Sequence, residues 1–505
     1  MLDGGHVEAR VFMWLAVTLV LARVGTFAVV EAIIFSSDEA LYGLMAKHIS
    51  EFDSFPIFSY GEGYRLAVEA WIIAPFFWLF GPTVLAMKIP LVLLNLLVAL
   101  SLMHWLRSTL PLRPALAFVA ALPFIMPTPV VAASLMANSG SATEPFLYIP
   151  LLWVLRGRPL AFGAVLMFGF LHREFTLYAL PAMVVVLGLR KAWLTRAHVR
   201  WIGWVAAGSG LVWLSVDLLR RLEVNSSAID QAEMLVNHAC WVPGEWPARL
   251  GYVATTALPT MAGSISTPFY DFSLRSPITT GGMAWVGWML AVAIVSMLVR
   301  LAWTWRRASL VGNFGVFLLL VGCIALAAYP LSCNLVVGAT PVIRYILLAL
   351  LVPVGCFAAF IACERSRNLR FAMVAVFALW GAANLVDNIR VIHTAYVSPE
   401  ADPHRELADF LVRHDIRYAR AGFWDAYIVD FLSGERVIVD SWGPVRIPEY
   451  TDQVNNAGDV VVDILRLPCD GQVTVAGAWC LKMPSHIAER VLRELAAPDG
   501  RQPRD

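Results

Sequence analysis

The chain has 505 residues, of which 59% are hydrophobic and 15% are charged, and its formal net charge at pH 7 is +1. Soluble domains are about 45–50% apolar and about 25% charged, so one soluble core could not bury this much apolar surface. The composition therefore excludes an ordinary soluble globular protein, and we expect membrane lipid as a partner and no nucleic acid.

Apolar segments of spanning length recur along the whole chain. A helix that spans a membrane needs about 20 apolar residues, and about eleven segments come near that length. These candidates are residues 11–30, 84–106, 114–136, 142–155, 159–171, 175–189, 201–219, 281–299, 310–330, 342–363 and 371–388. We therefore predict an α-helical polytopic membrane protein whose membrane domain covers residues 1–392.

The first candidate helix has two features of its own. It lacks a small-residue cleavage site, so we interpret Val11–Val30 as a retained signal anchor rather than a cleaved signal peptide. It also contains Arg23, which must either extend to the membrane surface or face other helices.

The basic residues predict the orientation. Cytoplasmic loops of membrane proteins carry an excess of Lys and Arg. Clusters of basic residues recur on one side of the candidate helices, at Arg10, Arg107 and Arg113, Arg156 and Arg158, Arg190, Lys191, Arg196 and Arg200, Arg300, Arg306 and Arg307, and Arg365, Arg367 and Arg370. We therefore place the N-terminus in the cytoplasm, and the first loop (31–83) and the C-terminal segment on the outer side of the membrane, in the periplasm.

Two apolar segments do not fit this alternation. If Leu66–Phe80 spanned the membrane, Arg107 and Arg113 would lie outside, so we assign it to the outer loop as an interfacial or re-entrant helix. The same argument makes residues 249–266 a second element at the outer surface.

The composition changes near His393, where polar and apolar residues begin to alternate as in soluble domains. Asp402 and Pro403 are typical of the N-cap and first position of a helix. Strands are predicted at residues 416–420, 436–440 and 459–464, and a helix at residues 423–431. Residues 393–505 are therefore expected to form a small periplasmic α/β domain with some parallel strand pairing.

The densest group of polar residues follows the first candidate helix. Asp38 and Glu39 either take a proton from an incoming hydroxyl as general bases or cap the following helix. Further along the loop, the glycines of Tyr60-Gly61-Glu62-Gly63-Tyr64-Arg65 allow the backbone to approach a ligand closely, and Arg65 matches the geometry of phosphate oxygens. The alternative there is a surface turn with an ordinary ion pair.

We take Asp38, Glu39 and Glu62 as catalytic candidates and Tyr60 and Arg65 as substrate-binding candidates. Glu69, one helical turn beyond Arg65, is a candidate for the structural partner in that alternative.

Two further groups lie at the expected outer ends of helices. His172, Arg173 and Glu174 interrupt two apolar runs, and they either bind a head group or phosphate or neutralise one another. Arg344 precedes Tyr345 at the start of a helix, where an arginine at membrane depth either snorkels or binds an anion. All five residues are substrate-binding candidates.

Signatures of a bound cofactor are missing from the sequence. We find no P-loop, nucleotide-binding glycine motif or Cys/His metal constellation, and no metal ligands are assigned. A divalent metal held by Asp38, Glu39 or Glu62 stays open, without a specific signature. Cys469 and Cys480 are spaced either for a disulfide in an oxidising compartment or as two unpaired thiols.

Together these motifs resemble the GT-C superfamily of membrane glycosyltransferases, and within it the bacterial protein O-mannosyltransferases and aminoarabinose transferases (glycosyltransferase family 39-like). The resemblance rests on Asp38-Glu39-Ala40-Leu41-Tyr42, Tyr60-Gly61-Glu62, the run from Phe80 to Pro90, and Arg344-Tyr345. Residues 424–427 and 431–439 resemble the extracytoplasmic segment of one bacterial branch.

The resemblance implies inverting transfer of a sugar from a polyprenyl-phosphate donor to an envelope glycan, lipid or protein outside the membrane. Asp38 would be the base and Glu62 the second loop acid. In aminoarabinose transferases a lysine follows the second acid and binds the donor phosphate; because Gly63 stands there in this chain, Arg65, Arg173 or Arg344 would take that role.

Three other functions remain open. A secondary transporter would have paired inverted repeats and ionisable groups near the bilayer midplane, whereas the ionisable groups here gather at one face. A lipid-glycan ligase would transfer a preassembled chain, and a non-enzymatic scaffold would not need the outer-loop acids.

Overall fold

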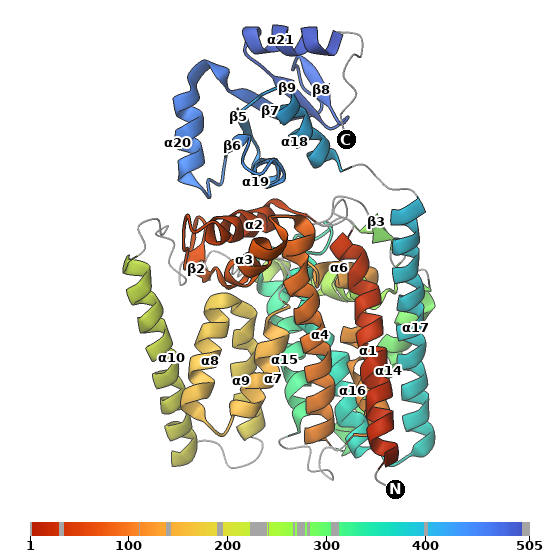
Figure 1. The fold of residues 1–505 in the computed structure, drawn as a ribbon. Helices are drawn as coiled ribbons and strands as arrows, with labels where there is room; N and C mark the ends of the chain where they lie inside the picture. Colours follow the sequence, from red (N-terminus) through yellow and green to blue (C-terminus); the bar gives the residue numbers. More distant parts are fainter. Residues whose placement is uncertain are drawn as a thin grey trace.

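The structure, a computed structural model, describes residues 3–29, 35–110, 112–137, 143–188, 195–222, 240, 242–265, 268–269, 278–279, 283–304, 313–397 and 402–496. A helical part ends with α17 (Arg367–Val397), and a C-terminal part with helices and a sheet begins with α18 (Pro403–Arg413). Figure 1 shows the C-terminal part seated on one end of the helical part, with the N terminus at the opposite end. The long helix α17 therefore passes the predicted boundary at residue 392.

The helical part is built from helices of very different lengths. Its α-helices, apart from those of the first loop, are α1 (Asp3–Val29), α4 (Val84–Thr109), α5 (Pro114–Ile125), α6 (Pro129–Ser134), α7 (Pro145–Leu155), α8 (Pro159–His172), α9 (Ala179–Gly188), α10 (Arg196–Leu222), α12 (Trp246–Tyr252), α13 (Leu258–Ala262), α14 (Ala284–Thr304), α15 (Phe314–Ala328), α16 (Leu351–Cys363) and α17. Within the described ranges, 5 helices are long and apolar enough to cross a membrane, namely α4, α10, α14, α15 and α17.

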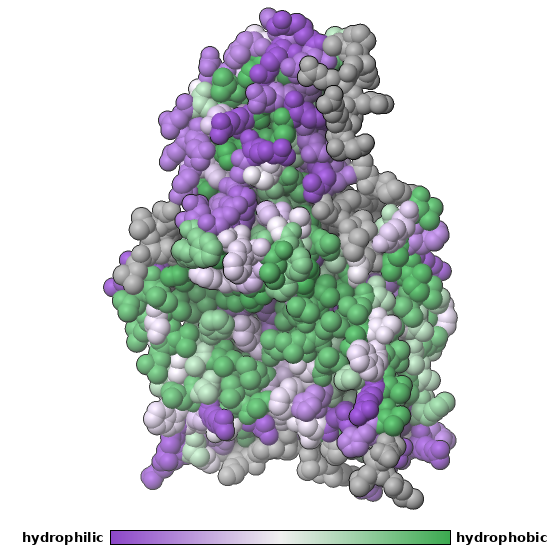
Figure 2. Space-filling view, in the orientation of Figure 1, coloured by the Kyte–Doolittle hydropathy of each residue, from purple (hydrophilic) through white to green (hydrophobic). Residues whose placement is uncertain are grey.

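Surface hydropathy agrees with a multi-pass membrane protein. Figure 2 shows hydrophobic residues over the flanks of the helical part, and hydrophilic residues over the C-terminal part and along the opposite edge. Apolar side chains that face outward on the long helices include Trp213, Trp288 and Trp303. Such a surface requires lipid around it, because water would have to solvate it otherwise.

Several predicted spans are not single helices. Residues 114–136 divide into α5 and α6, residues 175–189 begin with a 3₁₀ helix (Glu174–Tyr178), and residues 342–363 begin with two more (Ile343–Tyr345 and Leu347–Leu350). Proline explains the first break, because Pro127 and Pro129 lack the N–H group that a continuous helix needs. Several residues used for the predictions lie outside the described ranges, namely 31–34, Arg190, Lys191, Arg306, Arg307, 398–401 and 497–505.

Arg23 faces other helices and does not snorkel. Its side chain is fully buried. Its Nε donates to the carbonyl oxygen of Ile125 at 3.0 Å, and its Nη2 donates to Oδ1 of Asn95 at 2.8 Å. One of the two alternatives that the sequence left open is thus confirmed, and α1 is tied to α4 and α5 by polar contacts.

The first loop lies across the end of the helical part. It forms α2 (Ser37–Ser50), a hairpin of β1 (Phe58–Ser59) and β2 (Glu62–Leu66), and α3 (Val68–Phe80). Figure 1 shows α2 and α3 between the helical part and the C-terminal part. Trp78, Leu79 and Phe80 at the end of α3 are exposed, as a helix at a lipid surface would require.

The second predicted surface element, residues 249–266, is also helical where it is described. It consists of α12, a π-helix (Val253–Ala257) and α13. α13 ends at Gly263, whose φ of 72° is the left-handed conformation that favours glycine.

The C-terminal part contains a five-stranded sheet with the order β6-β5-β7-β9-β8. Its strands and helices are β5 (Tyr418–Ala421), α19 (Phe423–Leu432), β6 (Ile438–Ser441), α20 (Pro448–Ala457), β7 (Val462–Arg466), β8 (Val473–Val475), β9 (Trp479–Lys482) and α21 (Ser485–Ala496). β5 runs parallel to β6 and β7, and β9 runs antiparallel to β7 and β8. The predicted strand at 459–464 begins later, because Gly458–Val460 form a 3₁₀ helix.

Two sequence details of the C-terminal part are confirmed. Asp402 caps α18, since its Oδ1 accepts hydrogen bonds from the backbone N–H groups of His404 and Arg405. Cys469 and Cys480 form a disulfide, with their Cα atoms 6.4 Å apart.

α19 packs directly on α2 and joins the two parts of the molecule. Their shared apolar cluster includes Leu44, Ile73, Phe423, Tyr427 and Phe431, all buried. A Cβ atom at Gly43 would lie 2.6 Å from the Phe431 ring. Glycine at this position therefore allows α19 to approach the α2 backbone closely.

A half-buried carboxylate completes this contact. Glu435 accepts hydrogen bonds from Lys47 at 2.5 Å and from Tyr450 at 2.5 Å, and it lies 2.9 Å from Nε2 of His48. Burial alone would raise the pKa of Glu435, but hydrogen bonds with His48, Lys47 and Tyr450 outweigh burial and lower it to about 2. The ionised carboxylate therefore holds α2 and the C-terminal part together.

Gly43→Ala is expected to lower the midpoint of thermal unfolding in detergent, although alanine is favoured over glycine in helices by about 1 kcal/mol. The added Cβ, 2.6 Å from the Phe431 ring, would force α19 away from α2. The matched control is Gly210→Ala on α10, where nothing lies within 4 Å of the added atom. An unchanged or higher midpoint for Gly43→Ala would contradict this packing.

Acid should weaken the contact between α2 and the C-terminal part. Because the pKa of Glu435 falls from 4.5 to about 2 on folding, its stabilising contribution is complete above about pH 4.5 and is lost as the pH falls toward 2. We expect Glu435→Gln to have a lower thermal midpoint at pH 7 and a smaller further decrease at pH 4 than the wild type. Glu489→Gln, an exposed position on α21, is the control that should behave like the wild type.

Candidate active site

Asp38 and Arg344 meet at the boundary between the first loop and the end of the helical part. Asp38 lies in the first turn of α2, and Arg344 lies in the 3₁₀ helix Ile343–Tyr345. Nη1 of Arg344 donates to Oδ2 of Asp38 at 3.4 Å, and both side chains are about a quarter exposed, at 27% and 25%. The candidate base and a candidate phosphate ligand, distant in sequence, are thus neighbours at an accessible position.

Arg344 also lies on a large cavity, which we call the outer cavity. Its volume is about 910 Å³, within the range of ligand sites, about 300–1,000 Å³. Its lining residues come from both parts of the molecule: Phe35, Cys333, Asn334, Val336, Ala339, Thr340, Val342, Arg344, Tyr345, Pro403, His404, Trp424, Ile428, Arg466, Leu467, Ala478 and Trp479. The C-terminal part therefore forms one wall of the cavity, and the helical part forms the other.

The wall of the C-terminal part carries a carboxylate that is held in place. Asp425 on α19 accepts two hydrogen bonds from Arg466, at 2.9 and 2.8 Å, and lies 2.9 Å from Nε2 of His404. Burial would raise the pKa of Asp425, but its hydrogen bonds with His404 and Arg466 outweigh this and lower it to about 2. His404 and Arg466, which face the outer cavity, are fixed by the same carboxylate.

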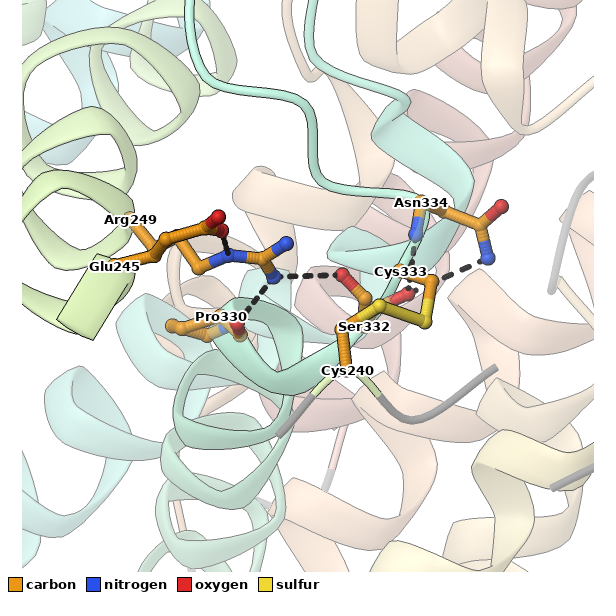
Figure 3. The surroundings of a disulfide bond; sticks show 7 residues. All are labelled: Cys240, Glu245, Arg249, Pro330, Ser332, Cys333 and Asn334. Carbon is orange, nitrogen blue, oxygen red and sulfur yellow. Dashed lines mark hydrogen bonds and ion pairs between the residues drawn. A yellow bond between two sulfur atoms is a disulfide. The ribbon is translucent and has the colours of Figure 1, made fainter. Parts of the chain in front are cut away.

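A disulfide stabilises the wall of the helical part. Figure 3 shows the bond between Cys240 and Cys333 beside a network around Arg249. Arg249 binds Glu245 at 3.1 Å and donates to the carbonyl oxygens of Pro330 and Ser332 at 2.8 and 3.0 Å. These contacts fix the backbone that leads into Cys333, which lines the outer cavity.

Glu62 is held by two arginines. Arg65 lies 2.9 Å from Oε2 and Arg446 lies 2.9 Å from Oε1. Arg446 comes from the C-terminal part and also donates to the carbonyl oxygen of Gly61 at 2.9 Å. A Cβ atom at Gly61, which has a φ of 65°, would lie 2.7 Å from the Arg446 side chain, so this position requires glycine.

Four of the predicted site residues surround one small pocket. Asp38, Tyr60, Glu62 and Arg65 line it together with Leu41, Tyr42, Met45 and Ser59. The hydroxyl of Tyr60 is engaged with Ser54 at 2.8 Å and with Nδ1 of His48 at 2.9 Å. Because its hydroxyl is occupied, Tyr60 contributes mainly its ring to the pocket.

Glu39 is directed elsewhere. It forms a capping box with Ser36, with bonds of 3.2 and 3.3 Å, and a fully buried ion pair with Lys88. Lys88 also donates to the carbonyl oxygen of Met136 at 2.8 Å. Of the two alternatives for the adjacent acids, Glu39 is a helix cap and a buried ion-pair partner, whereas Asp38 faces Arg344.

His172 and Arg173 are engaged with buried acids at the end of α8. Arg173 forms ion pairs with Glu69 and with Glu144, the latter at 3.3 Å, and His172 lies 3.1 Å from Glu69. Glu69 is therefore a partner of Arg173, and the ion pair that the alternative predicted for Arg65 is formed with Glu62. Glu174 is half-buried at the start of the next 3₁₀ helix.

Sequence reasoning missed several residues that position the site, among them Lys88, Arg446, Glu435 and the pair Cys240–Cys333. One signal was available for Lys88, because a charged residue inside an apolar helix needs a buried partner. The other residues make contacts with residues far away in the sequence, and no local sequence pattern predicts such contacts.

Breaking the Cys240–Cys333 disulfide should destabilise the cavity wall. The bond joins residues 93 positions apart, and closing a loop of that length contributes about 2–4 kcal/mol. The double variant Cys240→Ser, Cys333→Ser is therefore expected to have a lower midpoint of thermal unfolding. Cys323→Ser, which removes a free cysteine, is the control, and equal midpoints for the two would contradict the assignment.

Similarity to known proteins is found by comparing structures and not by comparing sequences. No protein-family model matches the chain, and no curated protein sequence matches it. The crystal structure of ArnT from Cupriavidus metallidurans bound to undecaprenyl phosphate is similar, with a TM-score of 0.60, 11% identity, and coverage of 94% of this chain and 96% of that chain. The apo structure of the same protein gives a TM-score of 0.57 at 10% identity, covering 92% and 94%. The chain therefore has the fold of ArnT, in agreement with the GT-C fold expected from its motifs.

Proposed function

We propose that this protein is a membrane glycosyltransferase that moves a sugar from a polyprenyl-phosphate donor to an acceptor hydroxyl with inversion. The observation that carries the proposal is the contact of Asp38 with Arg344 at the outer cavity. A carboxylate and a guanidinium at one accessible position supply the base and the phosphate ligand that such a transfer requires.

A protein with a similar fold binds a polyprenyl phosphate, which supports the proposed donor. ArnT was crystallised with undecaprenyl phosphate, and the helical part of this chain presents an apolar surface to lipid (Figure 2). A polyprenyl chain would stay in the membrane while its phosphate reaches the end of the helical part. An envelope glycan, lipid or protein would be the acceptor.

Each residue then has a defined task. The acceptor oxygen attacks the anomeric carbon, its proton passes to Asp38, and the bond from that carbon to the phosphate oxygen breaks, releasing polyprenyl phosphate. Arg344 stabilises the charge that develops on the leaving phosphate. Glu62 and Arg65, near Asp38 in the small pocket, orient the acceptor and the sugar.

The buried charges have structural tasks in this proposal. Glu39 is neutralised by Lys88, and Arg173 is neutralised by Glu69 and Glu144. Charges that are already paired away from water would lose those partners on binding a phosphate, which costs several kcal/mol. The phosphate ligand is therefore Arg344, whereas Arg65 stays paired with Glu62 in the small pocket.

We propose further that the N-terminus is cytoplasmic and that residues 402–496 form a domain in the bacterial periplasm. The disulfides Cys240–Cys333 and Cys469–Cys480 support this orientation, because disulfides persist in oxidising compartments. The C-terminal domain would complete the acceptor side of the outer cavity.

Asp38→Asn is expected to leave the protein folded and to reduce transfer by about 10²–10⁴-fold, the usual contribution of a general base. Mass spectrometry of cell-envelope glycans, with and without the protein, first identifies the product. Its formation is then compared in cells that carry the wild type, Asp38→Asn, or the control Asp53→Asn, an exposed acid of the same loop.

The product mass separates single-sugar transfer from ligation of a preassembled chain. Undiminished product with Asp38→Asn would remove Asp38 from the role of base, and equal glycans with and without the protein would refute glycosyl transfer.

A further inference from the structure

Three ligating side chains converge away from the proposed active site. Glu69 lies in the first turn of α3, Glu144 directly precedes α7, and His172 ends α8. One ligand atom from each lies within 4.8 Å of the others. All three side chains are more than nine-tenths buried, at 6%, 5% and 2% exposed.

The atoms that converge lack hydrogen-bond partners. Among the described residues, none donates to Oε2 of Glu69 or to Oε1 of Glu144, and Nε2 of His172 makes no hydrogen bond. His172 Nε2 is 3.1 Å from Glu69 Oε2 but is not aligned as a hydrogen bond. Buried polar atoms almost always have a hydrogen-bond partner. Three neighbouring buried atoms without one therefore indicate a site for a ligand.

Neighbouring residues orient the two carboxylates and the imidazole so that they can coordinate a cation. Arg173 binds the other carboxylate oxygen of both acids, Oε1 of Glu69 and Oε2 of Glu144, and the second oxygen of each acid has no hydrogen bond. Tyr148 contacts Nδ1 of His172 at 2.8 Å. When Nδ1–H donates to this hydroxyl, Nε2 carries the lone pair, as in the second-shell arrangement of metal-binding histidines.

We propose that Glu69, Glu144 and His172 bind a divalent transition-metal ion, with Zn²⁺ as the best match. One imidazole and two carboxylates favour Zn²⁺ over Mg²⁺ or Ca²⁺, which prefer oxygen ligands alone. Zinc–ligand distances of about 2.0–2.2 Å require the three atoms to move slightly closer together. The ion would tie α3 to the ends of α7 and α8 and so fix the platform under α2.

An ion pair with a protonated His172 is the competing explanation. In that case Nε2–H of the protonated His172 would point toward Oε2 of Glu69, and the protein would retain no metal ion at this position. Measuring bound metal separates the two, independently of any glycosyl transfer.

The test uses the purified full-length protein in detergent. After treatment with a chelator and dialysis against Zn²⁺, elemental analysis should find one zinc ion per chain, and Zn²⁺ but not Mg²⁺ should raise the midpoint of thermal unfolding. His172→Gln should lose the zinc and the shift. His48→Gln is the matched control, because His48 also lies among an acid and a tyrosine, but both of its ring nitrogens have partners.

Two outcomes would overturn the proposal: wild-type protein without stoichiometric zinc, or His172→Gln with the same zinc content as the wild type. If His172→Gln does not purify as a monodisperse protein, Glu144→Gln replaces it. Loading the wild type with Co²⁺ then tests the site by spectroscopy, because a bound Co²⁺ ion absorbs visible light through d–d transitions. Absence of this absorption would also refute the site.

Discussion

Helix α2 is held by ion pairs to the helical part on one side and to the C-terminal part on the other, and the position of the candidate active site depends on these contacts. Below it, Glu39 forms a fully buried ion pair with Lys88 of α4; above it, Glu435 binds Lys47 and His48. Removing one partner of a buried pair leaves an uncompensated charge and costs about 3–5 kcal/mol. Since Asp38 lies in the first turn of the same helix, these two anchors also fix the position of the candidate base.

The C-terminal part contributes to the site directly. Arg446 reaches Glu62 in the first loop, while His404, Trp424 and Arg466 line the outer cavity opposite Arg344. An apolar contact through Phe431 and a half-buried carboxylate at Glu435 hold this part against α2. Because the cavity lies between the two parts, any relative movement of them would change its shape.

Charges at the end of the helical part fall into two groups with different exposure. Asp38 and Arg344 keep about a quarter of their side-chain surface in contact with solvent, so water weakens the attraction between them. Glu69, Glu144 and Arg173 are almost completely buried, and the attraction of Arg173 for the two acids is strong because little water screens it. The first group is suited to chemistry, and the second to holding helix ends together.

The sequence by itself determined the membrane class, the GT-C resemblance, the capping of α18 by Asp402 and the choice of Asp38 and Arg344 as candidate site residues, because composition, hydropathy and short motifs are local properties. It did not reveal where the helices break, which acid Arg173 binds, or that Arg446 and Glu435 bridge to the first loop. Contacts between residues hundreds of positions apart depend on packing, in which volume, burial and charge are satisfied together. Only the tertiary structure decided that Glu39 supports α2 while its neighbour Asp38 faces the outer cavity's arginine, since one turn of helix points adjacent side chains in different directions.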